Sequence, residues 1–271
     1  MQSNNIFISI VMPTYNSEEY ILKTLECISS QSYKNWELII SDDGSADNTA
    51  KIINSFIYSN PELRVTLLQN AHRGPGMTRN QGVLAAASEW ISFLDSDDRW
   101  TPDKLERVVH YILEHPSCNL FCHSEMCIQS DGSKTMLEYF KSYDDRKPLR
   151  KQVYNRLLFS TSAIVCRKEL IIKAGLFDEG LSACQDYDLW YKMVPWMNPC
   201  FIKEQLGFYI ERPNNITSRK WSRIVPVVRV FYRHRRLGRP FEWLPLCAKI
   251  VVKPIFNEVA KIAKIYDYIF I

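Results

Sequence analysis

The sequence has little of what marks fibrous, linker-rich or membrane-spanning chains. Nine glycines and 13 prolines among 271 residues exclude a collagen-like or linker-dominated chain. No apolar run reaches the roughly 18–20 residues that a membrane-spanning helix needs, and no apolar signal segment precedes the first strand-like run. With 46% hydrophobic and 24% charged residues, the composition is that of a folded protein with one large α/β domain, alone or with an appendage.

The eight cysteines are scattered along the chain and form no Cys-x-x-Cys knuckle. Cys118, Cys122 and Cys127 lie close to His123, but the alternation of apolar and polar residues in this segment favours a half-buried strand over a zinc site. Scattered cysteines in a chain of this size are typical of a reducing compartment. We therefore expect a cytoplasmic protein.

The charge is divided unevenly along the chain. Residues 219–264 contain 12 lysines and arginines and two acidic residues, whereas residues 1–218 contain 22 basic and 27 acidic residues. This division predicts an acidic globular body and a basic C-terminal extension with its own partner. The extension, residues 219–271, also carries tryptophan and phenylalanine, and we expect a basic amphipathic helical segment there.

Three interpretations of this extension can be weighed: a membrane contact, packing against the body, and nucleic-acid binding. Its basic residues could meet anionic headgroups while its aromatic residues enter the acyl boundary, as in a peripheral membrane protein. Alternatively, the extension is a helical subdomain packed against the body. A basic, aromatic-rich segment also suits nucleic acid, but the acidic body argues against that partner.

Strands and helices alternate regularly over the first 115 residues. Apolar runs at 6–12, 36–40, 64–68 and 90–94 predict strands, and residues with helical apolar spacing lie between them. This alternation predicts a mostly parallel sheet with crossover helices, whose ligands bind beyond the carboxyl ends of the strands. The pattern weakens from 117 to 175, where strands are expected near 119–123 and 161–166.

The loops that follow the first three strands are polar. Residues 13–16 read Pro-Thr-Tyr-Asn and lack the glycine fingerprint of a dinucleotide site. Asp42 and Asp43 follow the second strand, where they either serve a ligand or cap the next turn. Arg79 lies in the first turn of the helix after the third strand, a position that favours an anion, although it could also be an ordinary surface arginine.

The loop after the fourth strand contains three carboxylates in four residues, Asp95, Asp97 and Asp98. Like charges held this close are costly unless a cation neutralises them. Oxygen ligands of this kind suit Mg²⁺ or Mn²⁺, which commonly bind one or two carboxylates together with the phosphates of a substrate. The loop therefore predicts a divalent cation and a nucleoside diphosphate.

Five segments in this order resemble one family, the inverting, nucleotide-sugar-dependent glycosyltransferases of family 2 with the GT-A fold. They are VMPTYNSEEYI, ELIISDDGSADNT, HRGPGMTRNQG, WISFLDSDDRW and GLFDEGLSACQDYDLW, and the resemblance covers roughly residues 6–215. It implies a Rossmann-like, mostly parallel sheet flanked by helices in residues 1–218. The nucleotide-binding half would be about 1–115, and the acceptor side about 116–218.

The resemblance also implies roles for individual residues. Asp186 matches the family's catalytic carboxylate and would deprotonate the acceptor hydroxyl, although it could instead cap the helix 187–193. The metal, Mn²⁺ or Mg²⁺, would be shared by Asp97, Asp95 and Asp98. Nucleotide-sugar binding is assigned to Pro13, Tyr15, Glu18, Asp43, Arg79, Asp95, Asp97 and Arg212.

The sequence departs from the family pattern at two places. The family often has Tyr-Arg-x-His beyond the base, but residues 209–212 read Tyr-Ile-Glu-Arg. Arg212 is then expected to pair with the diphosphate as a fixed cation, which lessens the need for a metal. The Gln-x-x-Arg-Trp motif of processive synthases is absent, so one sugar per encounter is expected.

These features together predict a transferase that moves one sugar from a nucleotide-sugar to a hydroxyl of a lipid-linked or saccharide acceptor. The resemblance favours UDP as the nucleotide, with GDP and dTDP left open, and the pathway would build a surface polysaccharide such as lipopolysaccharide or capsule. The enzyme would lie at the inner face of the cell membrane. The alternatives are a non-catalytic nucleotide-sugar-binding protein and a sugar-1-phosphate nucleotidyltransferase, whose phosphate loop residues 13–16 do not provide.

Overall fold

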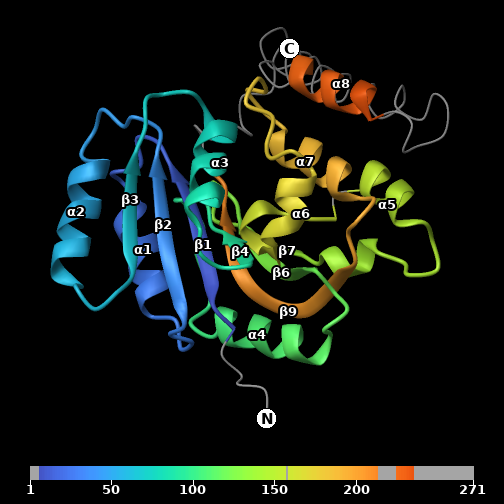
Figure 1. Cartoon of the computed structure of the whole chain (residues 1–271), viewed down its shortest axis with the longest axis horizontal. Coiled ribbons are helices and arrows are strands. Elements are labelled where there is room, and N and C mark those ends of the chain that lie inside the picture. Colours follow the sequence, from blue (N-terminus) through green and yellow to red (C-terminus); the bar gives the residue numbers. More distant parts are fainter. Residues whose placement is uncertain (1–5, 157, 213–223, 235–271) are drawn as a thin grey trace, which may run out of the picture.

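The structure is a computed structural model that describes residues 6–156, 158–212 and 224–234. These residues form a nine-stranded sheet with helices on both faces (Figure 1). The first half of the sheet is parallel, in the order β3 (Val65–Gln69), β2 (Trp36–Asp42), β1 (Ile8–Thr14) and β4 (Trp90–Phe93). The predicted strands and fold class of this half are confirmed.

The second half of the sheet is mixed rather than parallel. After β4 the order continues through β8 (Ile164–Arg167), β6 (Leu120–Ile128), β9 (Pro199–Ile210) and β5 (Arg99–Trp100), and β7 (Lys134–Leu137) pairs with β6. Only β6 and β9 are parallel here; the other pairings are antiparallel. A short 3-10 turn, Thr161–Ala163, replaces the start of the strand predicted near 161–166.

Strand β6 corrects one expectation from the sequence. Its first six residues are all buried, so the segment around His123 is covered on both faces and is not half-buried. The cause is its central position, between β8 and β9, with helices above and below.

Two apolar cores lie on opposite faces of the sheet, as expected for strands buried on both sides. On β1, Ile10 and Met12 face one core and Val11 faces the other. The first core is covered by α1 (Ile21–Ser29), α2 (Thr49–Ser59) and α4 (Lys104–Glu114). The second is covered by α3 (Pro75–Ala85), α5 (Leu149–Asn155), α6 (Lys168–Lys173), α7 (Gln185–Met193) and α8 (Ile224–Arg233).

Helix α3 packs unusually close to the sheet. A Cβ added at Gly82 would lie 2.4 Å from Val11 Cγ1, so only glycine allows this approach of helix and strand. The close contact holds α3, which carries Arg79 three residues before Gly82, against the middle of β1.

Helix α8 is the described part of the predicted C-terminal extension. Val227, Val230 and Phe231 are buried in the second core, and Tyr154 Oη donates a hydrogen bond of 3.1 Å to the Phe231 carbonyl. This helix packs on the body next to α7 (Figure 1). The rest of the predicted extension, 219–223 and 235–271, lies outside the described residues.

None of the helices that the structure describes is both long and apolar enough to traverse a bilayer.

Candidate active site

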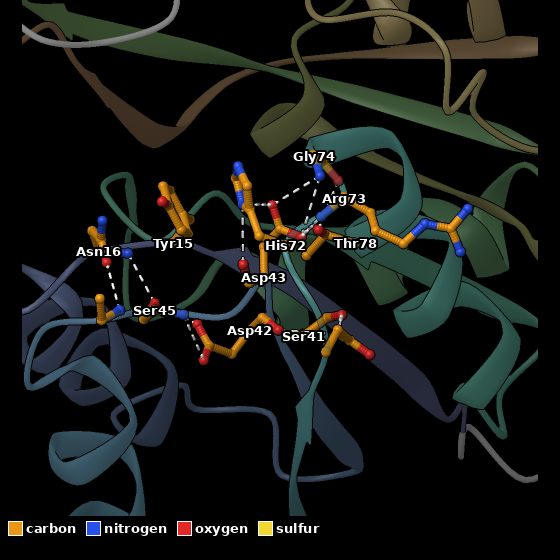
Figure 2. Close-up of polar contacts among 12 residues, drawn as sticks. Tyr15, Asn16, Ser41, Asp42, Asp43, Ser45, His72, Arg73, Gly74 and Thr78 are labelled. Carbon is orange, nitrogen blue, oxygen red and sulfur yellow. Dashed lines mark hydrogen bonds and ion pairs between the residues drawn. The ribbon is translucent and has the colours of Figure 1, made fainter.

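The loops after β1 and β2 are tied together at the carboxyl end of the sheet. Asp43 N–H donates to the Thr14 carbonyl at 2.9 Å, Asn16 N–H donates to Ser45 Oγ at 2.9 Å, and Ala46 N–H donates to Asn16 Oδ1 at 2.9 Å. Two of these contacts are drawn in Figure 2. They fix the backbone on both sides of Tyr15, whose side chain is exposed at the surface of the loop.

The Asp43 carboxylate is buried and binds the turn that precedes α3. It accepts hydrogen bonds from Arg73 N–H at 2.8 Å and Gly74 N–H at 3.0 Å, and the Nδ1 atom of His72 lies 2.9 Å from its Oδ2. Gly44, at φ +75°, makes this approach possible, because a Cβ there would lie 3.1 Å from His72 N. Asp43 thus links the second and third loops.

The His72 ring also stacks on Tyr15. The two ring centroids lie 4.4 Å apart with an angle of 24° between the planes. In Figure 2 the two rings lie beside each other, and dashed lines connect His72 to Asp43. His72 lies in the segment HRGPGMTRNQG, and the sequence pattern indicates no role for it.

Arg79 lies among three of the predicted carboxylates. One of its terminal nitrogens donates to Asp95 Oδ1 at 2.7 Å. Burial alone would lower the pKa of Arg79, but the charges of Asp95, Asp186 and Asp97 raise it. Four residues that the resemblance assigned to catalysis and nucleotide-sugar binding are therefore brought together at the carboxyl ends of β1 and β4.

The Asp97 carboxyl group lies next to a second carboxylate, that of Asp95. Burial and the neighbouring Asp95 carboxylate raise its pKa to about 6. Arg212 lies opposite, with a hydrogen bond of 3.1 Å to the Asp97 carbonyl and its Nε 4.0 Å from Asp97 Oδ2. The Arg212 guanidinium is also held 3.4 Å above the Tyr20 ring.

Asp98 is turned into the protein. Its Oδ2 accepts from Ser162 Oγ at 2.6 Å and its Oδ1 accepts from Ile210 N–H at 3.0 Å. The same Ser162 hydroxyl accepts from Asp95 N–H at 3.2 Å. Asp98 thereby ties the carboxylate loop to the end of β9, and nothing in the sequence pattern identified Ser162 as its partner.

Asp186 and Asp188 lie two residues apart on α7 in opposite electrostatic environments. Burial raises the pKa of Asp186, and the Asp95 charge acts in the same direction. Burial would also raise the pKa of Asp188, but hydrogen bonds from His234 and Lys192 outweigh it and hold the value at about 2. Carboxyl groups separated in this way are typical of sites where only one of them accepts a proton. Cys184, not Asp186, lies at the N-cap position of α7.

Pro13 and Glu18 stand apart from this cluster. Pro13 is buried within β1 beside Ser41 of β2. Glu18 is exposed, and its Oε2 accepts from Asn48 N–H at 2.9 Å and Asn48 Nδ2 at 2.8 Å. Its carboxylate therefore anchors the first loop to the start of α2.

The oxygen ligands in this cluster fit a divalent cation that also binds substrate phosphates. Over residues 6–156, 158–212 and 224–234, no group of three or more His, Cys, Asp or Glu side chains forms a metal cage. A cage is not required for Mg²⁺ or Mn²⁺, which bind one or two carboxylates plus phosphate oxygens. Asp95 and Asp97 provide that donor set.

A scan against family models matches residues 9–179 to the model described as Glycosyl transferase family 2. The chain belongs to this family. The predicted enzyme class, a glycosyltransferase, is confirmed with it. Among curated relatives, the amylovoran biosynthesis glycosyltransferase AmsB of Erwinia amylovora is 34% identical over 210 residues, which cover 75% of this chain and 66% of that protein.

Two solved structures share the fold of this glycosyltransferase. S. aureus TarS 1–349 in complex with UDP-GlcNAc has a TM-score of 0.70 at 21% identity and covers 92% of this chain and 71% of that one. The mannosyltransferase PcManGT from Pyrobaculum calidifontis, in complex with GDP-Man and Mn²⁺, has a TM-score of 0.65 at 18% identity and covers 95% and 79%. The predicted GT-A architecture is confirmed.

Proposed function

We propose that this family 2 glycosyltransferase moves one sugar from a nucleoside-diphosphate sugar to an acceptor hydroxyl with inversion at the anomeric carbon. The observation that carries the proposal is the convergence of Arg79, Asp95, Asp97 and Asp186 on one another at the carboxyl end of the sheet. Asp186 acts as the general base, and its raised pKa favours proton uptake.

The diphosphate of the donor lies between Arg79 and Arg212. Arg79 Nε is buried and has no hydrogen-bond partner among the described residues, which leaves a charged donor for a phosphate oxygen. Arg212 is held rigidly by Tyr20 and the Asp97 backbone, so it brings a second positive charge without losing much side-chain freedom.

A divalent cation, Mn²⁺ or Mg²⁺, would be held by Asp95 and Asp97 together with the donor phosphates. When bound, it would stabilise the charge that develops on the leaving diphosphate. Asp98 is left out of this ligand set, because both of its carboxylate oxygens already accept hydrogen bonds from the protein. The Mn²⁺ bound in the mannosyltransferase structure supports metal use.

The nucleobase lies at Tyr15 and Asp43, near Pro13. A carboxylate at this position accepts a hydrogen bond from a base that carries a ring N–H, as uracil, thymine and guanine do. UDP is favoured, and the UDP-GlcNAc and GDP-Man complexes of the two structural relatives support nucleotides of this class.

The acceptor is a lipid-linked or saccharide hydroxyl in the synthesis of a surface polysaccharide, which the similarity to an amylovoran enzyme supports. The enzyme contacts the inner face of the cell membrane through its basic extension. On α8, Val225, Arg229 and Tyr232 are exposed at the helical spacing of one face, which suits an interfacial contact. Sedimentation with vesicles containing anionic lipid tests this contact. No difference in binding between anionic and neutral vesicles would contradict it.

The donor site is tested by thermal unfolding with UDP, GDP, dTDP and CMP, each with and without Mn²⁺. A nucleotide at a hundredfold excess over its dissociation constant should add about 2.7 kcal/mol of stability. We expect a Mn²⁺-dependent shift for one nucleotide, which Asp97→Ala abolishes. If no nucleotide stabilises the wild-type protein, the proposal fails.

The base is tested by Asp186→Asn, which should lower turnover by about 10²–10⁴ while nucleotide binding is retained. Asp131→Asn is the matched control, because it removes a carboxylate in the distant β6–β7 turn. Wild-type turnover in Asp186→Asn would remove Asp186 from the role of base.

A further inference from the structure

His72 makes the contacts that a nucleobase would make at this site. Its ring lies flat against Tyr15, with centroids 4.4 Å apart, and its Nδ1 lies 2.9 Å from Asp43 Oδ2. The hydrogen bond of Nδ1 goes to the Asp43 carbonyl oxygen, at 3.2 Å. A planar ring that stacks on Tyr15 and places a ring nitrogen beside the Asp43 carboxylate is the geometry proposed above for uracil. The imidazole and the base cannot both occupy it.

We propose that His72 is a specificity-determining residue of the donor site that the nucleobase must displace. This inference rests on the proposed function, because it takes Tyr15 and Asp43 to bind the base. Donor binding then replaces the stacked imidazole, with its nitrogen beside the Asp43 carboxylate, by a stacked base whose ring N–H faces the same carboxylate. Only a base that makes both the stacking contact with Tyr15 and the polar contact with Asp43 compensates for the contacts that His72 gives up.

The structure allows His72 to leave at small cost. Its side chain is 58% exposed, so rotation about its side-chain bonds carries the ring into solvent. Asp43 keeps its hydrogen bonds from Arg73 N–H and Gly74 N–H, so the turn before α3 stays in place. The exchange therefore involves a side chain, not the loop.

The exchange also predicts which bases compete. Uracil, thymine and guanine present a ring N–H that takes the place of the His72 Nδ1 atom beside the Asp43 carboxylate. Neutral cytosine presents an unprotonated ring nitrogen at the corresponding position, which repels the carboxylate. Displacing His72 with cytosine leaves Asp43 without the contact it had, so cytidine nucleotides are selected against.

The test is the binding of UDP and of uridine to His72→Ala, measured by titration calorimetry. The apparent dissociation constant equals the intrinsic dissociation constant divided by the fraction of molecules whose site is open. If the His72 ring closes the site in most molecules, its removal should tighten UDP binding about threefold to tenfold. The gain should be the same for uridine as for UDP and absent for inorganic pyrophosphate, because the exchange occurs only at the base.

Controls separate this effect from general changes. His110→Ala removes another exposed histidine, which pairs with Glu114 on α4, and should leave UDP affinity unchanged. His72→Ser should behave as His72→Ala does. In proton–carbon spectra of the five histidines, the ring signal absent from His72→Ala should shift on UDP addition as the ring leaves Tyr15.

The UDP affinity of His72→Ala distinguishes the possible roles of the His72 ring. Weaker UDP binding by His72→Ala would show that the base stacks on His72, and unchanged binding would show that the ring does not compete; either result overturns the inference and leaves the proposed function standing. If neither UDP nor GDP binds the wild type or any variant, the proposed function fails and the inference fails with it.

Discussion

The substitution Asp188→Asn tests whether α8 holds the helix that carries Asp186. The Asp188 carboxylate is fully buried and lies 2.9 Å from Lys192 Nζ, 2.8 Å from an Arg233 nitrogen and 2.9 Å from His234 Nε2. Lys192 belongs to α7 itself, whereas Arg233 and His234 belong to α8 and the residue after it. Asparagine keeps the shape of the side chain and removes the charge that joins the two helices.

The size of the effect follows from the pKa of Asp188. A value lowered from 3.8 to about 2 corresponds to about 2 kcal/mol of stability at neutral pH. Because the folded-state pKa lies below the unfolded-state value, this stability is complete above pH 4 to 5 and is lost as the pH falls toward 2. The free energy of unfolding of the wild type should therefore exceed that of Asp188→Asn by about 2 kcal/mol at pH 7 and by about half of that at pH 3.

Urea unfolding of both proteins between pH 3 and pH 8 measures this difference, and thermal unfolding at pH 7 should show a midpoint lowered by about 4–8 °C. Asp144→Asn is the control, since Asp144 also pairs with two cations, Arg146 and Lys147, whose side chains are exposed and therefore screened by solvent. Asp144→Asn should lower the free energy of unfolding by less than Asp188→Asn does. A difference of zero at pH 7, or one that grows as the pH falls, would refute the reasoning.

Four further substitutions test other contacts. Gly82→Ala should destabilise the protein by about 1–3 kcal/mol in urea unfolding, because the new Cβ meets Val11; an unchanged midpoint would show that α3 is free to move away from β1. Arg212→Ala should weaken UDP binding roughly tenfold to a hundredfold in calorimetry while leaving uridine binding unchanged, and an equal loss for both would place Arg212 outside the diphosphate site. Asp98→Asn should lower the melting temperature but keep the Mn²⁺ dependence of nucleotide binding, which Asp97→Asn should abolish; loss of that dependence in both would make Asp98 a ligand.

The parallel half of the sheet could be predicted because its signals are local. The apolar run around Ile10 and the run around Ile39 are continuous, as strands covered on both faces require, and each is followed by residues with helical spacing. The mixed half could not be ordered, since β4 pairs with β8 and β6 pairs with β9 across separations of 73 to 82 residues. No periodicity in the sequence encodes such pairings.

The candidate site shows the same division between local and distant signals. Asp95, Asp97 and Asp186 were found because each follows or opens a recognisable element in a motif. The role of Asp98 depends on Ser162, which is 64 residues away and looks like an ordinary serine in the sequence. The sequence pattern indicates no role for His72, because its stacking on Tyr15 depends on how two loops meet in space.

The charge asymmetry of the sequence has a partial explanation inside the molecule. Arg233 and His234 belong to the basic extension, yet they bind Asp178 and Asp188 of the acidic body. Some of the positive charge at 219–264 therefore pairs with negative charge in 1–218. The charge count alone overstates the positive charge that is available to bind an outside partner. Since Asp188 lies two residues from Asp186, the part of the extension that the structure describes contributes first to holding the helix that carries the proposed base.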